Sequence, residues 1–252
     1  MVFIFAAMLS VTAAAQDVVE SKMYAWKTPS TETGRKVLTS TIFEGRAHAM
    51  QHLKMSANSI LSSNKKSLFT VPDTEEHLLI IRSGRVVVSL NDSLTTVGAG
   101  SIALLLPGEK YGLQNKWNEP CTFYLMQYTS KDSANTVKGD AAAGSILRDW
   151  NKVAFKPHDK GGIRNYFDRA TAMCKRFEMH VTTLKEGIKS HEPHTHSAEE
   201  IVLIIENQTE MQIGNEFYKG AAGDIYYLGS NVPHAIQNIG TGTCTYFAFQ
   251  FE

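Results

Sequence analysis

The chain has 252 residues, of which 43% are hydrophobic, and its 25 basic and 25 acidic side chains give a formal net charge of zero. This length allows two domains of ordinary size, each with a core of its own. The charge balance disfavours nucleic acid and acidic membrane surfaces as partners, because both attract proteins with a net positive charge.

The first sixteen residues, MVFIFAAMLSVTAAAQ, start with an uninterrupted apolar run and end in small residues. Ala13 and Ala15 fit the small-x-small rule for cleavage before Gln16, so we expect a signal peptide over residues 1–15 and a periplasmic or secreted mature protein. No Lys or Arg precedes the apolar run, which departs from the usual pattern. The run is too short to cross a bilayer, and we expect no stable membrane insertion.

Short β-like segments separated by Gly, Asn and Ser turns occur in both halves of the chain, and they predict an all-β protein. They cover residues 78–81, 86–90, 102–106, 123–128, 177–183, 201–205, 209–213, 225–228 and 245–251. Residues 131–147 are polar and rich in Gly and Ala, which predicts a linker with a short helical turn near its end.

An internal repeat relates the two halves. The sequence RAHAM at residues 46–50 recurs as RATAM at residues 169–173, an offset of 169 − 46 = 123. The same offset joins CTFYLMQY, which begins at Cys121, to CTYFAFQF, which begins at Cys244. A constant offset between several markers indicates two copies of one β unit. The two predicted domains span residues 22–130 and 148–252.

The second copy contains the sequence HEPHTHSAEE. His194, His196 and Glu200 are separated by even numbers of residues, so on a strand their side chains point to one face. Residues 201–205 predict a buried strand, and His234 lies beyond a turn from which a return strand can bring it alongside. Three imidazoles and one carboxylate suit manganese, iron, nickel, zinc or copper, and the lack of a nearby Cys disfavours a structural zinc site.

These residues resemble the two metal motifs of the cupin superfamily. The segment from Gly187 through HTHSAEE is similar to G-x5-HxH-x3,4-E-x6-G, and GDIYYLGSNVPHAIQN is similar to G-x5-PxG-x2-H-x3-N. The resemblance implies two tandem cupin barrels, each a jelly roll, with one divalent transition metal in the C-terminal barrel. The implied ligands are His194, His196, Glu200 and His234. Asn207 and Asn231 stand where the family has Gly, and Asn tolerates the positive φ that these turns need.

The first copy has lost this ligand set. Subtracting 123 from the four implied ligands gives Val71, Asp73, His77 and Tyr111. Val71 has no donor atom, and Tyr111 is a poor ligand unless it is deprotonated. His77 with Asp73 alone would rarely hold a divalent ion. We therefore expect the N-terminal barrel to act as a scaffold, a lid or the surface of a homodimer.

The surroundings of the metal follow from strand parity, although one β-bulge would exchange inside and outside. The expected pocket residues are Met179, Gln212, Tyr227 and Phe249, with Gln250 as a further candidate. His191 lies three residues before His194, so it has the opposite parity unless Pro193 turns the chain. We favour His191 as the catalytic group at the pocket rim, where its imidazole can shuttle protons near neutral pH.

The chain has three cysteines, Cys121, Cys174 and Cys244. Cys121 and Cys244 occupy equivalent places in the last strands of the two barrels, which separates them too far for a disulfide. No base is placed near any of them by the sequence. We expect buried, unreactive thiols.

Among function classes, the sequence favours a metal-dependent enzyme acting on a small polar molecule such as a sugar acid or a ureide. A non-catalytic metal-bearing module that binds small molecules or carbohydrates is the first alternative. The layout is also similar to ureidoglycine aminohydrolases, but those enzymes carry a differently arranged Glu, His, His and Gln ligand set. The superfamily includes many reactions, so the resemblance does not select a substrate.

Overall fold

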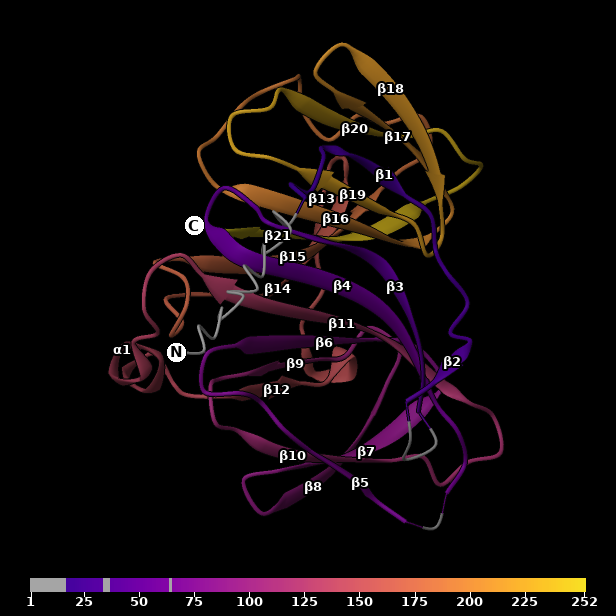
Figure 1. Cartoon of the computed structure of the whole chain (residues 1–252). Helices are drawn as coiled ribbons and strands as arrows, with labels where there is room; N and C mark the ends of the chain where they lie inside the picture. Colours follow the sequence, from indigo (N-terminus) through magenta and orange to yellow (C-terminus); the bar gives the residue numbers. More distant parts are fainter. Residues whose placement is uncertain (1–16, 34–36, 64) are drawn as a thin grey trace, which may run out of the picture.

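The structure is a computed structural model that describes residues 17–33, 37–63 and 65–252. The predicted signal peptide over residues 1–15 lies outside the described residues. The fold is all-β, as the sequence predicted, and consists of two barrels that lie one above the other (Figure 1). Each barrel has one seven-stranded sheet and one smaller sheet.

The N-terminal barrel is the lower one in Figure 1. Its large sheet has the order β12 (Ile146–Arg148), β9 (Ile102–Leu105), β6 (Glu76–Ser83), β11 (Cys121–Ser130), β4 (Met50–Ile60), β3 (Val37–Gly45) and β2 (Thr31–Glu32). Its small sheet has the order β5 (Ser67–Thr70), β10 (Lys110–Gln114), β7 (Arg85–Leu90) and β8 (Ser93–Gly98).

The C-terminal barrel repeats this plan. Its large sheet has the order β1 (Lys22–Tyr24), β19 (Ile225–Leu228), β16 (Glu199–Glu206), β21 (Cys244–Phe251), β15 (Phe177–Leu184), β14 (Gly161–Arg169) and β13 (Lys156–His158). Its small sheet has the order β18 (Glu216–Ala221), β17 (Gln208–Ile213) and β20 (His234–Asn238). The described helical segments are α1 (Thr136–Ala141) in the linker, slightly earlier than predicted, and the 3-10 turn η1 (Trp150–Lys152).

The first strand of each copy is exchanged between the barrels. β1 belongs to the first copy but pairs with β19, with Met23 opposite Tyr226. β12 pairs in the same way with β9, with Leu147 opposite Ala103. The predicted boundaries therefore need correction, because β1 completes the C-terminal sheet and β12, at the end of the predicted linker, completes the N-terminal sheet. Sequence similarity marks the repeat unit, whereas hydrogen bonding defines the barrel.

The two seven-stranded sheets face each other and share one core. This core includes Tyr124 and Met126 of β11 together with Phe247 and Phe249 of β21, all at most 1% exposed. Each barrel also has a separate interior core between its own two sheets. Both faces of the central strands are thus buried, which explains their continuous apolar sequences.

The repeated RAxAM motif links the barrels through buried carboxylates. Glu199 of β16 accepts hydrogen bonds from the backbone N–H groups of His48 and Ala49, at 2.7 and 2.8 Å. Glu76 of β6, at the equivalent position 199 − 123 = 76, accepts them from Ala172 and Met173, at 2.6 and 3.2 Å. Each copy therefore supplies one carboxylate to the other copy's motif. We call these two sets of contacts the carboxylate clamps.

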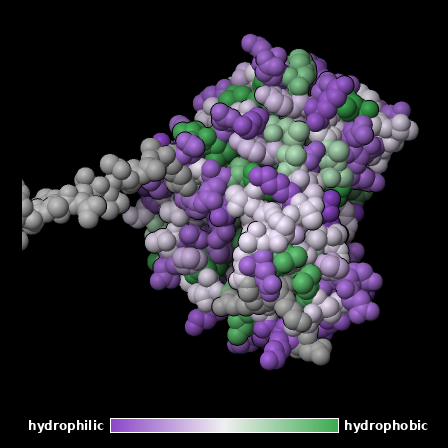
Figure 2. All heavy atoms as spheres, turned by 45° about the vertical axis from the view of Figure 1, so that its right-hand side comes forward, coloured by the Kyte–Doolittle hydropathy of each residue, from purple (hydrophilic) through white to green (hydrophobic). Residues whose placement is uncertain are grey.

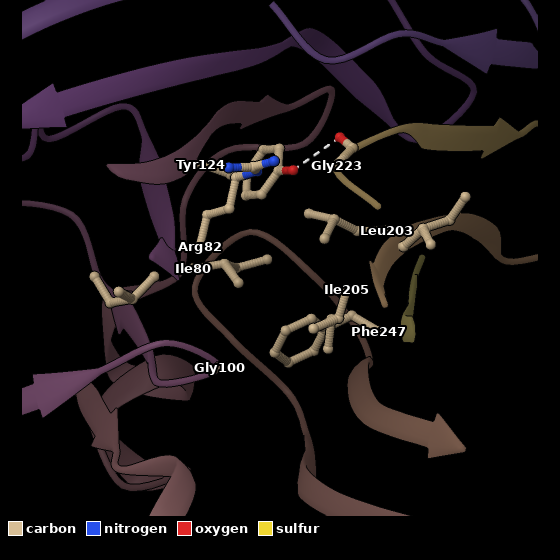
Figure 3. A pocket seen from close by; sticks show the side chains of 10 residues that line it. Ile80, Arg82, Gly100, Tyr124, Leu203, Ile205, Gly223 and Phe247 are labelled. Atoms are coloured by element: carbon tan, nitrogen blue, oxygen red, sulfur yellow. Dashed lines mark hydrogen bonds between the residues drawn. The ribbon is translucent and has the colours of Figure 1, made fainter. Parts of the chain in front are cut away.

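A cavity of about 180 Å³ lies on the approximate two-fold axis between the barrels. In Figure 3, Arg82 and Tyr124 of the first copy lie opposite Ile205 and Phe247, which occupy the equivalent positions of the second copy. The Tyr124 hydroxyl donates to the Gly223 carbonyl at 2.8 Å. The two copies have thus diverged here, with the polar groups on the N-terminal side.

The three cysteines are buried and unpaired, as predicted. Burial raises the pKa of Cys121 to about 12 and that of Cys244 to about 11, and it also raises the pKa of Cys174. Thiols with such pKa values carry almost no thiolate at neutral pH and are poor nucleophiles.

On the face shown in Figure 2, hydrophilic side chains predominate, and the hydrophobic ones lie in small separate groups. This mixture is typical of a surface in contact with water. Within the part of the chain that the structure describes, no helix has the length and apolar character needed to cross a membrane.

Candidate metal centre

Three histidines converge at one end of the C-terminal barrel. His194 and His234 lie side by side on an isolated antiparallel bridge, with backbone N–H to O distances of 3.2 and 3.1 Å. The Asn231 N–H donates to the carbonyl of His196 at 2.8 Å, and Asn231 has a φ of 60°. Asn207 has a φ of 69°, so both Asn residues adopt the conformation expected where the family motif has Gly.

The imidazoles surround one point. One ligand atom from each of His194, His196 and His234 lies within 4.8 Å of the others. Among the described residues, these three form the one group of three or more His, Cys, Asp or Glu side chains close enough to hold a metal ion. Glu200 Oε2 lies 3.0 Å from His196 Nε2 and 3.3 Å from His234 Nε2. The structure therefore brings together all four residues that the sequence motif selected.

Hydrogen bonds at the far side of two rings fix which nitrogen faces the centre. His196 Nδ1 lies 2.8 Å from the carbonyl of Ala198, and His234 Nδ1 lies 2.8 Å from that of Val232. Nδ1 must donate to these carbonyls, so a neutral ring turns the lone pair of Nε2 toward the centre.

The donor set fits a divalent cation. His234 Nε2 is buried and has no hydrogen-bond partner among the described residues, although Glu200 Oε2 is 3.3 Å away. Lone pairs on two imidazoles and a carboxylate repel one another unless protons or a cation lie between them. Nitrogen and oxygen donors at such spacing suit a transition metal.

The electrostatics show how protons occupy the centre without metal. Burial alone would raise the pKa of Glu200, but the hydrogen bond from His196 and the neighbouring His234 ring outweigh it and lower that pKa to about 2. The hydrogen bond to Glu200 raises the pKa of His196, whereas burial and the neighbouring histidines lower that of His194. Protonated His196 and ionised Glu200 thus stabilise each other in the metal-free protein.

This proton pairing predicts opposite pH dependences with and without metal. In metal-free protein, the contribution of Glu200 to the free energy of unfolding is complete above its unfolded pKa near 4.5 and is lost as the pH falls toward 2. The contribution of His196 is complete below its unfolded pKa near 6.5 and is lost as the pH rises through its raised folded pKa. Metal competes with the proton on His196, so apparent metal affinity should fall about tenfold per pH unit below that pKa. Thermal unfolding at pH 5.5 and pH 8 should show a larger metal-induced stabilisation at pH 8, and an equal shift at both would contradict this assignment.

A cavity of about 320 Å³ adjoins the histidines inside the C-terminal barrel. Its lining includes His191, whose Nδ1 lies 3.0 Å from Nδ1 of His194, so Pro193 does turn the chain and bring His191 to the centre. Gln250 also lines the cavity and donates to Glu200 Oε2 at 3.2 Å.

The expected pocket residues lie elsewhere. Met179, Tyr227 and Phe249 form the core between the barrels and face away from the cavity. Gln212 is partly exposed on β17, where it donates to the Gly214 carbonyl at 3.1 Å. Both faces of the large sheet are buried, so hydrophobicity does not show which face lines the cavity inside the barrel. The prediction chose the opposite face of each strand for these residues.

The register corrects this assignment. Phe249 pairs with Met179 and Ile201 in one row across the sheet. The adjacent row places Gln250 opposite Glu200, and the cavity wall uses the parity of Glu200. Through this register, the face of Glu200 continues on β15 as His180 and Thr182, which line the cavity and which the sequence interpretation missed.

The equivalent end of the N-terminal barrel lacks this donor set. Val71 is fully buried, and burial raises the pKa of Tyr111, which therefore stays protonated at neutral pH. His77 Nε2 lies 3.0 Å from a carboxylate oxygen of Glu75. Asp73 is exposed. These positions agree with a structural role for the first barrel.

Comparisons with known proteins identify the fold. A cupin domain, Cupin_2, matches residues 180–249, the segment that contains the four converging residues. No curated protein has a significant match to the sequence.

Solved structures match over nearly the whole chain. AerE from Microcystis aeruginosa has a TM-score of 0.67 at 16% identity, over 91% of this chain and 99% of its own. Protein Ylba from E. coli has a TM-score of 0.69 at 13% identity, over 95% of both chains. Oxalate decarboxylase from Bacillus subtilis, which has Mn(II) centres, has a TM-score of 0.68 at 13% identity, over 94% of this chain and 78% of its own. At these identities the likeness shows a shared fold.

Proposed function

We propose that this chain, which has the fold of two cupin barrels, is a metal-dependent enzyme acting on a small polar molecule. The reaction site is the C-terminal centre of His194, His196, Glu200 and His234. The observation that carries this proposal is the pair of Nε2 atoms directed at one buried carboxylate. A divalent transition metal bound there would polarise a carbonyl or enolate oxygen, or activate water or dioxygen.

The surrounding residues orient the ligands and move protons. Gln250 donates to Glu200 Oε2 and holds the carboxylate toward the histidines. His191 lies beside His194 at the cavity, where its imidazole can take a proton from a bound substrate or return one. Val202 and Met211 line the same cavity and exclude water from part of it. The donor set is compatible with manganese, iron, nickel, zinc or copper.

Replacing Glu200 by Gln separates catalysis from simple binding. The carboxylate's charge tunes the acidity of the bound ion as well as holding it, so E200Q should lower kcat about 100-fold or more while ligand affinity changes much less. The comparison requires equal metal occupancy, established by elemental analysis of both proteins.

A substrate screen comes first. Sugar acids, ureides, aromatic diols and oxalate are tested with manganese-, iron-, nickel- and zinc-loaded protein, and turnover is measured for each pair. If every metal form is inert while one compound binds and raises the melting temperature, the protein is a metal-bearing binding module and the enzyme proposal fails.

A further inference from the structure

One side of the metal cavity carries the ammonium group of Lys160. The cavity lining includes one carboxylate, Glu200, which belongs to the metal centre. It also includes Lys160, together with His158 and His180, which lie beside the carboxylates of Asp159 and Glu178 at 3.9 and 2.8 Å. A bound divalent ion would add a further positive charge, so the part of the cavity between the metal and Lys160 favours anions.

Lys160 is held in place over the cavity by backbone contacts. Its Nζ donates to the carbonyl of Ser190 at 2.6 Å, and its own carbonyl accepts from the N–H of Lys185 at 2.9 Å. The next residue, Gly161, has a φ of +147°, and a Cβ there would lie 2.0 Å from the Thr183 carbonyl. Only glycine fits, so the β13–β14 turn that carries Lys160 sits tightly against β15.

The ammonium group has unused capacity. An ammonium has three donors, and one of them reaches Ser190. Within residues 17–33, 37–63 and 65–252, no ion pair within 4 Å joins Lys160 Nζ to a carboxylate. A charged amine beside a cavity, held by a neutral carbonyl, is available to pair with an anionic ligand.

The rest of the wall indicates what the anion carries. Val202, Met211, Ile236 and Ala248 form an aliphatic part of the lining, and Tyr246 lies with them. A volume of about 320 Å³ accommodates a small organic molecule. The occupant is thus a short carbon chain or ring with polar ends.

We propose that the ligand of the metal centre is a small organic acid with two polar ends, one reaching the metal and the other, a carboxylate, pairing with Lys160. This inference rests on the proposed function and names the substrate class of the same site. Lys160 is a binding residue that selects anions, and it takes no part in holding the metal.

The test uses aliphatic dicarboxylates from malonate to adipate and their monoamides as probes. Binding to manganese-loaded protein is measured by calorimetry for the wild type, K160M, K160R and K185M. Lys185 is a matched control, because its Nζ also donates to a backbone carbonyl, that of Asp159 at 2.7 Å, but it does not line the cavity.

We expect the dicarboxylate of fitting length to bind wild type about tenfold more tightly than its monoamide, the size of one partly shielded charge pair. K160M should reduce this ratio to below about twofold, whereas K160R and K185M should keep it. An unchanged ratio in K160M, or the absence of any preference for a dicarboxylate, would overturn the inference.

Metal analysis of the same samples distinguishes the two proposals. If wild type holds metal but does not prefer dicarboxylates, the substrate class is wrong and the metal centre stands. If wild type holds no metal under any loading condition, the proposed function fails, and this inference fails with it because the first polar end has no partner.

Discussion

Replacing His196 by Ala is expected to reduce the bound transition metal from about one ion per chain to nearly none. His196 contributes one of the two Nε2 atoms that face Glu200, and its ring is already oriented by the Ala198 carbonyl. Removing it leaves two imidazoles and a carboxylate, with a gap on the side nearest Glu200. Elemental analysis after metal loading and desalting measures the change directly.

The matched control is Tyr111→Phe in the first barrel. Tyr111 occupies the position equivalent to His234, and its burial keeps the hydroxyl protonated, so its removal should leave the metal content unchanged. Two ions per wild-type chain would show that the first barrel also binds metal. An undiminished content in H196A would show that the ion lies elsewhere.

The repeat and the metal motif could be derived from the sequence because both depend on local spacing. His194, His196 and Glu200 lie within seven residues of one another, and a motif of that length fixes their common direction. His234 required a return strand, which the Asn231 turn provides with its φ of 60°. The sequence thus contained the ligands and the turn that joins them.

The pocket walls could not be derived in the same way. Lys160, in the β13–β14 turn, and His180 on β15 line the cavity far from the metal motif in the sequence, and their place depends on how the strands pair. The strand exchange could not be predicted either, because the two large sheets offer similar edges. The strands β1 and β12 are short and have no sequence pattern that selects one edge over the other. Local periodicity identifies strands, but it does not identify partners.

The carboxylate clamps join each RAxAM motif to the other copy, and they lead to a stability prediction. Glu76 is fully buried and accepts from two backbone N–H groups and from the Tyr128 hydroxyl. Its pKa is raised, because burial outweighs these hydrogen bonds. The equivalent Glu199 is the sequence neighbour of Glu200, which belongs to the proposed metal centre, so Glu76 offers the cleaner test.

Glu76→Ala should lower the free energy of unfolding by about 3 kcal/mol or more, because three buried donors lose their acceptor at once. Glu76→Gln should cost less, since its amide oxygen can still accept from the backbone and the Tyr128 hydroxyl can turn to accept from its nitrogen. Glu216→Ala, at an exposed position on β18, should change the stability by at most about 0.5 kcal/mol. Urea unfolding of metal-free protein measures all three. In a separate metal-loaded sample without urea, E76A should keep its metal, because the residues that Glu76 holds, Ala172 and Met173, do not line the metal cavity. A loss of metal from folded E76A would show that the clamp also shapes the metal centre.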